Sequence, residues 1–83
     1  MRNNANIAVV IPAVNEERSV EKVVSSIPKW VDDVVVVDNA STDKTADVAR
    51  AAGARVVFES RRGYGSACQA GIRALNDPDI VVF

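Results

Sequence analysis

Histidine is absent from this chain and cysteine occurs once, at Cys68, so two kinds of site are excluded at the outset. An internal disulfide needs two thiols, and a cysteine–histidine metal centre needs several such side chains. A single thiol is typical of a protein from a reducing compartment. The net charge of −1 lacks the basic excess that nucleic-acid-binding proteins carry, so we expect no nucleic-acid partner.

Long hydrophobic runs are also missing. The first apolar segment, residues 7–11, is interrupted by Pro12 and is too short for a signal-peptide core or a transmembrane segment. We therefore expect a cytoplasmic chain; for a longer parent protein, a position at the cytoplasmic face of a membrane stays open. With 48% apolar and 25% charged residues, the 83-residue sequence suits one small domain over residues 1–83.

The sequence does contain a regular alternation of β-branched runs and helical patterns. Residues 7–11, 34–37 and 55–59 are predicted to be strands, and a fourth strand begins at residues 80–83. Between them, apolar residues recur with helical spacing. The residues on these predicted faces are Val20, Val23, Val24 and Ile27, then Val48, Ala49 and Ala52 after Thr45, then Cys68, Ile72 and Leu75 in a helix over 65–76.

This order predicts an α/β fold, half of a doubly wound parallel sheet with the Rossmann-like βαβαβαβ pattern. Crossovers between parallel strands are right-handed, which places helices on both faces of the sheet. We expect Asn15 to cap the first helix and Ser41 or Thr42 to cap the second. The fourth strand is expected to leave an exposed sheet edge.

Polar clusters follow the first three predicted strands, at residues 12–16, 38–43 and 61–65. Each cluster taken singly is explained by a turn or a helix start, and Asp43 is better explained as structural than as a ligand contact. In a parallel sheet, however, all three lie on one rim, where such folds bind ligands. Gly63 and Gly65 would let backbone amides approach a phosphate at a helix start, and Arg62 would supply charge. Together the clusters favour a nucleotide site.

The position of the glycines narrows the kind of nucleotide. A dinucleotide-binding domain carries its glycine-rich loop after the first strand, whereas here that loop has no glycine, and no P-loop motif is present. A receiver-like or flavodoxin-like signalling domain is also disfavoured. It would need a phosphate-accepting aspartate after the third strand, where this chain has residues 59–61, Glu-Ser-Arg.

Residues 11–17 (IPAVNEE), 36–45 (VVDNASTDKT) and 62–67 (RGYGSA) with Gly71 resemble the opening blocks of family 2 glycosyltransferases, which have the GT-A fold. The branch they look most like includes dolichyl- and polyprenyl-phosphate sugar synthases. The resemblance covers residues 7–83 and implies binding of a nucleoside diphosphate sugar, from UDP or GDP, for inverting transfer to an acceptor such as a polyprenyl phosphate. Val14 stands where an aromatic residue is common in the family, and Asn39 where a second acid is frequent.

By this resemblance the nucleotide-binding residues are Pro12, Ala13, Val14, Asn15, Glu16, Asp38, Asn39, Arg62 and Gly63. In the family, an Asp-x-Asp motif that binds Mg or Mn and the catalytic base follow the fourth strand, so residues 80–83 would lead into that motif. We therefore expect no catalytic residue and no metal in this fragment, which alone should be inactive. The alternative is a non-catalytic α/β module that self-associates as a homo-oligomer, or regulates, through the edge of the fourth strand.

Overall fold

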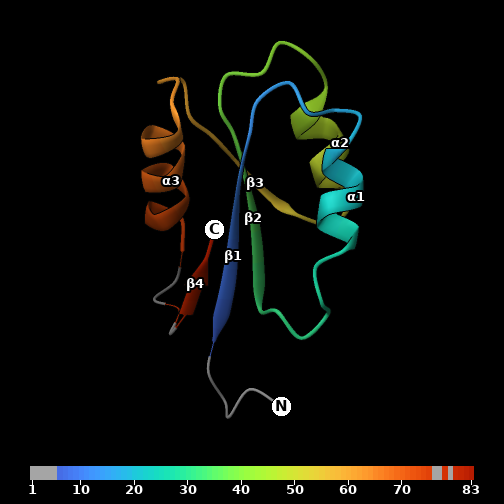
Figure 1. Cartoon of the computed structure of the whole chain (residues 1–83), viewed down its shortest axis with the longest axis vertical. Coiled ribbons are helices and arrows are strands. Elements are labelled where there is room, and N and C mark those ends of the chain that lie inside the picture. The colour runs from blue at the N-terminus through green and yellow to red at the C-terminus, as the bar shows by residue number, and fades with distance from the viewer. Residues whose placement is uncertain (1–5, 76–77, 79) are drawn as a thin grey trace.

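A parallel sheet with helices on both faces forms the protein in the computed structural model, which describes residues 6–75, 78 and 80–83 (Figure 1). Strands and helices alternate along the chain, as predicted. The elements are β1 (Ile7–Ala13), α1 (Val20–Ser25), β2 (Asp33–Asp38), α2 (Thr45–Ala51), β3 (Arg55–Phe58), α3 (Tyr64–Arg73) and β4 (Ile80–Val82).

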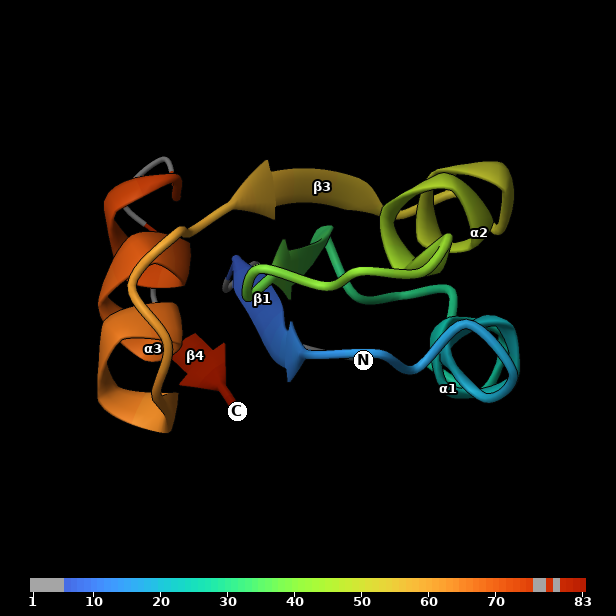
Figure 2. The same ribbon diagram turned by 90° about the horizontal axis from the view of Figure 1, so that it is seen from above.

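The four strands lie in the order β3-β2-β1-β4, all parallel. Helices α1 and α2 cover one face and α3 covers the other, as the view from above shows (Figure 2). The first two crossovers place β2 beside β1 and β3 beside β2, whereas the third returns across the sheet to place β4 on the other side of β1. A right-handed crossover in that reversed direction passes over the opposite face of the sheet, which is where α3 lies. The predicted half of a doubly wound fold is confirmed, with β4 at one edge of the described sheet.

Strand β2 is the centre of the core. Val35, Val36 and Val37 are fully buried, with alternate side chains pointing to opposite faces. Val36 packs in the cluster beneath α1 and α2, whereas Val35 and Val37 pack in the cluster beneath α3. A continuous run of β-branched residues is therefore required here, because both faces of this strand are covered.

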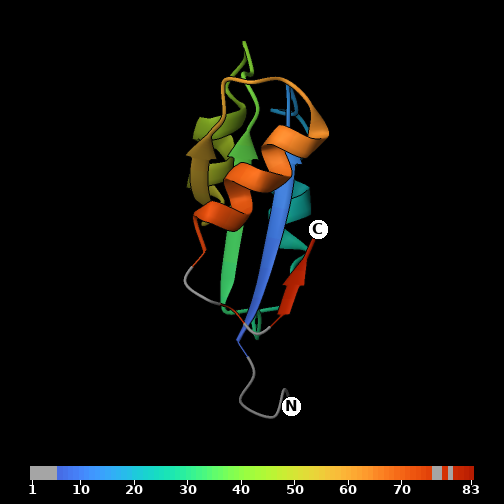
Figure 3. The ribbon, with the colours of Figure 1, turned by 90° about the vertical axis from the view of Figure 1, so that its left-hand side faces the viewer.

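Helix α3 lies across β1 and β2 and packs through small residues (Figure 3). Its buried residues are Ala67, Ala70 and Gly71, so the predicted face of Cys68, Ile72 and Leu75 is only partly right. Leu75 packs against the core cluster beneath α3 and Cys68 is half-buried, and Gly71 allows the close approach to the sheet that the sequence predicts. Ile72 is half exposed, because an apolar residue that large would hold the helix away from the sheet. The helix ends at Arg73, and the last residue of its predicted span, position 76, lies outside the described residues.

The predicted helix caps are also wrong. Helix α1 begins at Val20 after Ser19, and α2 begins after Lys44, with no side-chain capping bond at either start. Asn15 instead adopts a left-handed conformation with φ +53° in the loop before α1. The short polar side chains of these loops are used for bonds between loops, as described below, so they are not available to cap.

The close approach of α3 to the sheet gives a stability prediction. A Cβ atom at Gly71 would collide with Val10 Cγ1 and lie 3.2 Å from Val37 Cγ2. Gly71→Ala should lower the free energy of unfolding by about 1–3 kcal/mol, the usual cost of overpacking a core. Urea denaturation followed by circular dichroism measures this change.

Gly65→Ala is the matched control in the same helix, because a Cβ at Gly65 meets nothing within 4 Å. It should leave stability unchanged or raise it by about 0.5–1 kcal/mol. In a Val10→Ala background, the further cost of Gly71→Ala should shrink, since the colliding methyl group is gone and only the contact with Val37 remains. An unchanged cost in that background would contradict the proposed collision.

Candidate functional site

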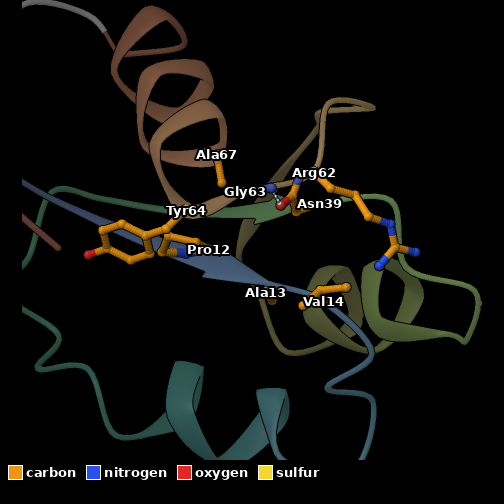
Figure 4. Close-up of a pocket in the computed structure, with 8 residues that line it drawn as sticks. All are labelled: Pro12, Ala13, Val14, Asn39, Arg62, Gly63, Tyr64 and Ala67. Atoms are coloured by element: carbon orange, nitrogen blue, oxygen red, sulfur yellow. Dashed lines mark hydrogen bonds between the residues drawn. The ribbon is translucent and has the colours of Figure 1, made fainter.

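A pocket of about 260 Å³ opens at the rim formed by the carboxyl ends of the strands (Figure 4). The ends of β1 and β2 and the loop between β3 and α3 form its walls. Its lining residues are Pro12, Ala13, Val14, Asn39, Arg62, Gly63, Tyr64 and Ala67. The strand register explains the convergence, since Ala13 pairs with Asp38, and Asp38 pairs with Phe58.

The predicted site residues divide into two groups. Those that line the pocket are Pro12, Ala13, Val14, Asn39, Arg62 and Gly63. Asn15, Glu16 and Asp38 lie on the same rim but do not line it. Tyr64 and Ala67 also line the pocket; both lie in the block of residues 62–67, but neither was among the predicted nucleotide-binding residues. Ala67 lies one helical turn after Gly63, and that spacing was the signal that could have found it.

Asn39 connects β2 to the loop after β3. Its side chain is buried, and its Nδ2 donates to the carbonyl oxygens of Glu59 at 3.0 Å and Arg61 at 2.8 Å. Its Oδ1 accepts the backbone N–H of Gly63 at 3.0 Å. That N–H is therefore not available for a phosphate, contrary to the prediction for this glycine, whose φ of +128° turns the chain into α3.

Arg62 carries the positive charge of the pocket. Its Nη2 donates to the carbonyl oxygen of Ala40 at 3.1 Å. Within the described ranges, Arg61 and Arg73 each pair with Glu59, whereas Arg62 pairs with no carboxylate. A guanidinium without a carboxylate partner at a pocket edge can bind an anionic ligand, especially a phosphate group.

Glu59 pairs with the neighbouring Arg61, so the Arg61 guanidinium is not available to an anionic ligand in the way that of Arg62 is. Its carboxylate accepts the backbone N–H of Arg61 at 2.8 Å and the Arg61 guanidinium at 3.3 Å. The backbone bond, followed by the side-chain bond, lowers the pKa of the Glu59 carboxyl below its usual value. Glu59 thus remains ionised and fixes the start of the loop that carries Arg62.

A second network joins the loop after β1 to the loop after β2. The backbone N–H of Asn15 donates to Ser41 Oγ at 2.9 Å, and Asn15 Oδ1 accepts the N–H of Thr42 at 2.8 Å. The N–H of Glu16 donates to Thr45 Oγ1 at 2.8 Å. These contacts are why Asn15 and the hydroxyl residues do not cap helices: they tie the two loops into one rim.

The acidic residues of the second loop are engaged in the same way. Asp38 is buried, and its Oδ1 accepts the N–H of Ser41 at 3.1 Å. Asp43 accepts hydrogen bonds from the hydroxyl and N–H of Thr45 and from the N–H of Glu17, and the Thr45 hydroxyl bond is the main cause of its lowered pKa. These contacts agree with the structural role predicted for Asp43.

Neither a metal centre nor a membrane span is found in the part of the chain that the structure describes. No group of three or more cysteine or acidic side chains there could hold a metal ion. Among the helices of residues 6–75, 78 and 80–83, none is long and apolar enough to cross a membrane.

Comparison with known proteins shows to which family this chain belongs. The model of glycosyl transferase family 2 matches residues 8–83. An uncharacterized glycosyltransferase of Mycobacterium tuberculosis is 49% identical over 76 residues, which cover 92% of this chain and 34% of that protein. A dolichyl-phosphate hexose transferase of Haloferax volcanii is 38% identical over 79 residues, with the same shares of the two chains covered.

A solved structure agrees with these relatives. Glucosyl-3-phosphoglycerate synthase of M. tuberculosis, in complex with Mn²⁺, UDP-glucose and glycerol 3-phosphate, superposes with a TM-score of 0.84 and 39% identity. The alignment covers 94% of this chain and 32% of that structure. The fold is that of the GT-A glycosyltransferases, and the chain belongs to glycosyl transferase family 2. It spans about a third of the length of these relatives.

The lowered pKa of Glu59 gives a prediction about acid stability. A carboxyl whose pKa is lower in the folded state stabilises the fold above its unfolded pKa, and this stabilisation is lost as pH falls through the folded pKa. The destabilisation caused by Glu59→Gln should therefore be largest near neutral pH and shrink on acidification. Urea unfolding of both proteins over a pH series measures it.

Arg61→Ala serves as the matched control for this series. It removes the guanidinium but keeps the backbone N–H that bonds to Glu59, so the pKa of Glu59 should stay lowered, by a smaller amount. An NMR titration of the Glu59 carboxyl reports this directly. A destabilisation by Glu59→Gln that is equal at all pH values would contradict the argument.

Proposed function

We propose that this chain is the nucleotide-binding part of an inverting glycosyltransferase that takes its sugar from a UDP- or GDP-sugar. The observation that carries the proposal is the pocket at the carboxyl ends of the strands, with Arg62 at its edge and no carboxylate of the described residues paired with it. The UDP-glucose bound to a structural relative of 39% identity supports it. A diphosphate needs a cation, and Arg62 supplies one.

The pocket residues divide the nucleotide between them in this proposal. Pro12, Ala13 and Val14 form an apolar wall against which a base can lie, and Val14 is exposed enough to make that contact. In this arrangement Asp38 and Asn39 are on the base and ribose side, while Arg62 and Gly63 border the diphosphate. Asn15 and Glu16 act through the shape of the first loop, which their backbone bonds to the second loop determine.

The transfer reaction needs more than this rim supplies. Mg or Mn, when bound, neutralises the departing diphosphate, and the described residues offer no group of ligands for such an ion. In line with the family resemblance of residues 7–83, we propose that the metal ligands and the catalytic base follow the fourth strand, so this chain alone leaves UDP-glucose intact. For the whole enzyme we propose a polyprenyl phosphate acceptor at the cytoplasmic face of a membrane. The dolichyl-phosphate hexose transferase among its relatives supports that acceptor class.

An NMR titration of the chain with UDP, GDP and UDP-glucose tests the proposed site. Shifts should be confined to residues 12–16, 38–41 and 62–65, and the tighter nucleotide identifies the base. Arg62→Ala should weaken binding about tenfold or more, because a hydrogen bond to a charged group is worth about 1.5–3 kcal/mol. A folded chain that shows no shifts at millimolar nucleotide would overturn the proposal.

Arg50→Ala is the matched control for the titration. Arg50 is an exposed arginine on α2, where it pairs with Asp47, and it does not line the pocket. This variant should bind nucleotide as the native chain does. Equal weakening by both variants would show that Arg62 acts only through the overall charge.

One observation favours the alternative of a self-associating module. An apolar groove of about 520 Å³ runs along β1, β4 and α1, and Val23, Trp30, Val82 and Phe83 in its lining are exposed. If this module pairs through β4, sedimentation velocity should show a dimer whose fraction grows with concentration, together with no nucleotide binding. A monomer that binds UDP rejects the alternative.

A further inference from the structure

We infer that Asn39 is a positioning residue, a latch that holds the loop of residues 59–63 so that Arg62 reaches the pocket. The inference rests on the proposed function for its effect on nucleotide, and on geometry alone for the latch itself. The name latch refers to the three hydrogen bonds between the Asn39 side chain and the loop.

The latch uses both ends of the Asn39 amide. A primary amide has two N–H donors, and both of the Nδ2 donors are taken by carbonyl oxygens of the loop. Its oxygen accepts the N–H of Gly63. Asn39 is also buried, so these bonds are shielded from competing water. The amide therefore joins the end of β2 to the loop through all three bonds of the latch.

The latch holds the backbone on both sides of Arg62. The carbonyl oxygen of Arg61 and the N–H of Gly63 stand on the two sides of Arg62 along the chain, and Asn39 binds both. The backbone of Arg62 is thereby fixed at both of its neighbours. Its guanidinium then donates to the carbonyl oxygen of Ala40, the residue after Asn39, and Figure 4 shows Arg62 and Asn39 together at the pocket.

The geometry requires an amide at position 39. An aspartate has the same shape but no N–H, so two carbonyl oxygens would lose their donors and face a carboxylate instead. Leaving buried polar groups unpaired is costly, and the nearby Glu59 carboxylate would add repulsion. Asn39→Asp should therefore release the loop although it changes the shape of the side chain very little.

Hydrogen exchange of the Gly63 amide in the ligand-free chain tests the latch. In Asn39→Asp this exchange should accelerate at least about tenfold relative to the Val36 amide at the centre of β2. The loss of both Nδ2 donors releases the loop, although the aspartate keeps an oxygen that can accept the Gly63 N–H. Asn15→Asp is the matched control on the same rim. Asn15 uses only its side-chain oxygen, which an aspartate retains, so Gly63 exchange should not change.

A double-mutant cycle on UDP affinity tests what the latch does. If Asn39 acts through Arg62, Asn39→Asp should weaken UDP binding about tenfold in the native background and hardly at all in an Arg62→Ala background. A purely structural role would give equal losses in both backgrounds and would overturn the inference. Unchanged Gly63 exchange in Asn39→Asp would overturn it as well.

Two further outcomes keep the test decisive. If Asn39→Asp does not fold, Asn39→Ala replaces it in both experiments, because it removes all three hydrogen bonds of the latch without adding charge. If the native chain binds neither UDP nor GDP, the proposed function fails and with it the effect of Asn39 on nucleotide; if it binds GDP alone, the cycle is run with GDP. Gly63 exchange would then still decide whether the latch exists.

Discussion

Burial of β2 on both faces is the constraint on which the rest of this structure depends. Val35, Val36 and Val37 have no exposed surface, and they send side chains alternately into the two helical layers. With this strand fixed at the centre, parallel pairing on either side brings the ends of β1, β2 and β3 level. The site is a consequence of that register, because loops that leave level strand ends meet on one rim.

Two hydrogen-bond networks then turn the meeting of loops into a defined surface. One ties the first loop to the second through Asn15, and the other ties the third loop to β2 through Asn39. Both use short amide side chains, which can donate and accept within one or two bonds of the backbone. They leave the pocket itself lined by small and apolar groups, with Arg62 as the charge at its edge.

Membership in glycosyl transferase family 2 fits the composition of this pocket. The part of the chain described here has a pocket edge with a guanidinium and an apolar wall, but no group of acidic side chains for a metal. In the function we propose, nucleotide recognition and the chemistry of transfer therefore belong to different segments of a longer enzyme. The small residues Ala67, Ala70 and Gly71 serve the first task indirectly, since they set how closely α3 carries its loop to the sheet.

The sequence alone determined the order of elements, the parallel α/β class and the shared rim, because β-branched runs, helical spacing and turn residues are local signals. It did not determine the partners of the polar side chains. Asn15 reads locally as a helix cap and Gly63 as an open amide, yet each bonds to a loop more than twenty residues away. Such bonds depend on which loops the sheet register brings together, and only the tertiary structure decides that.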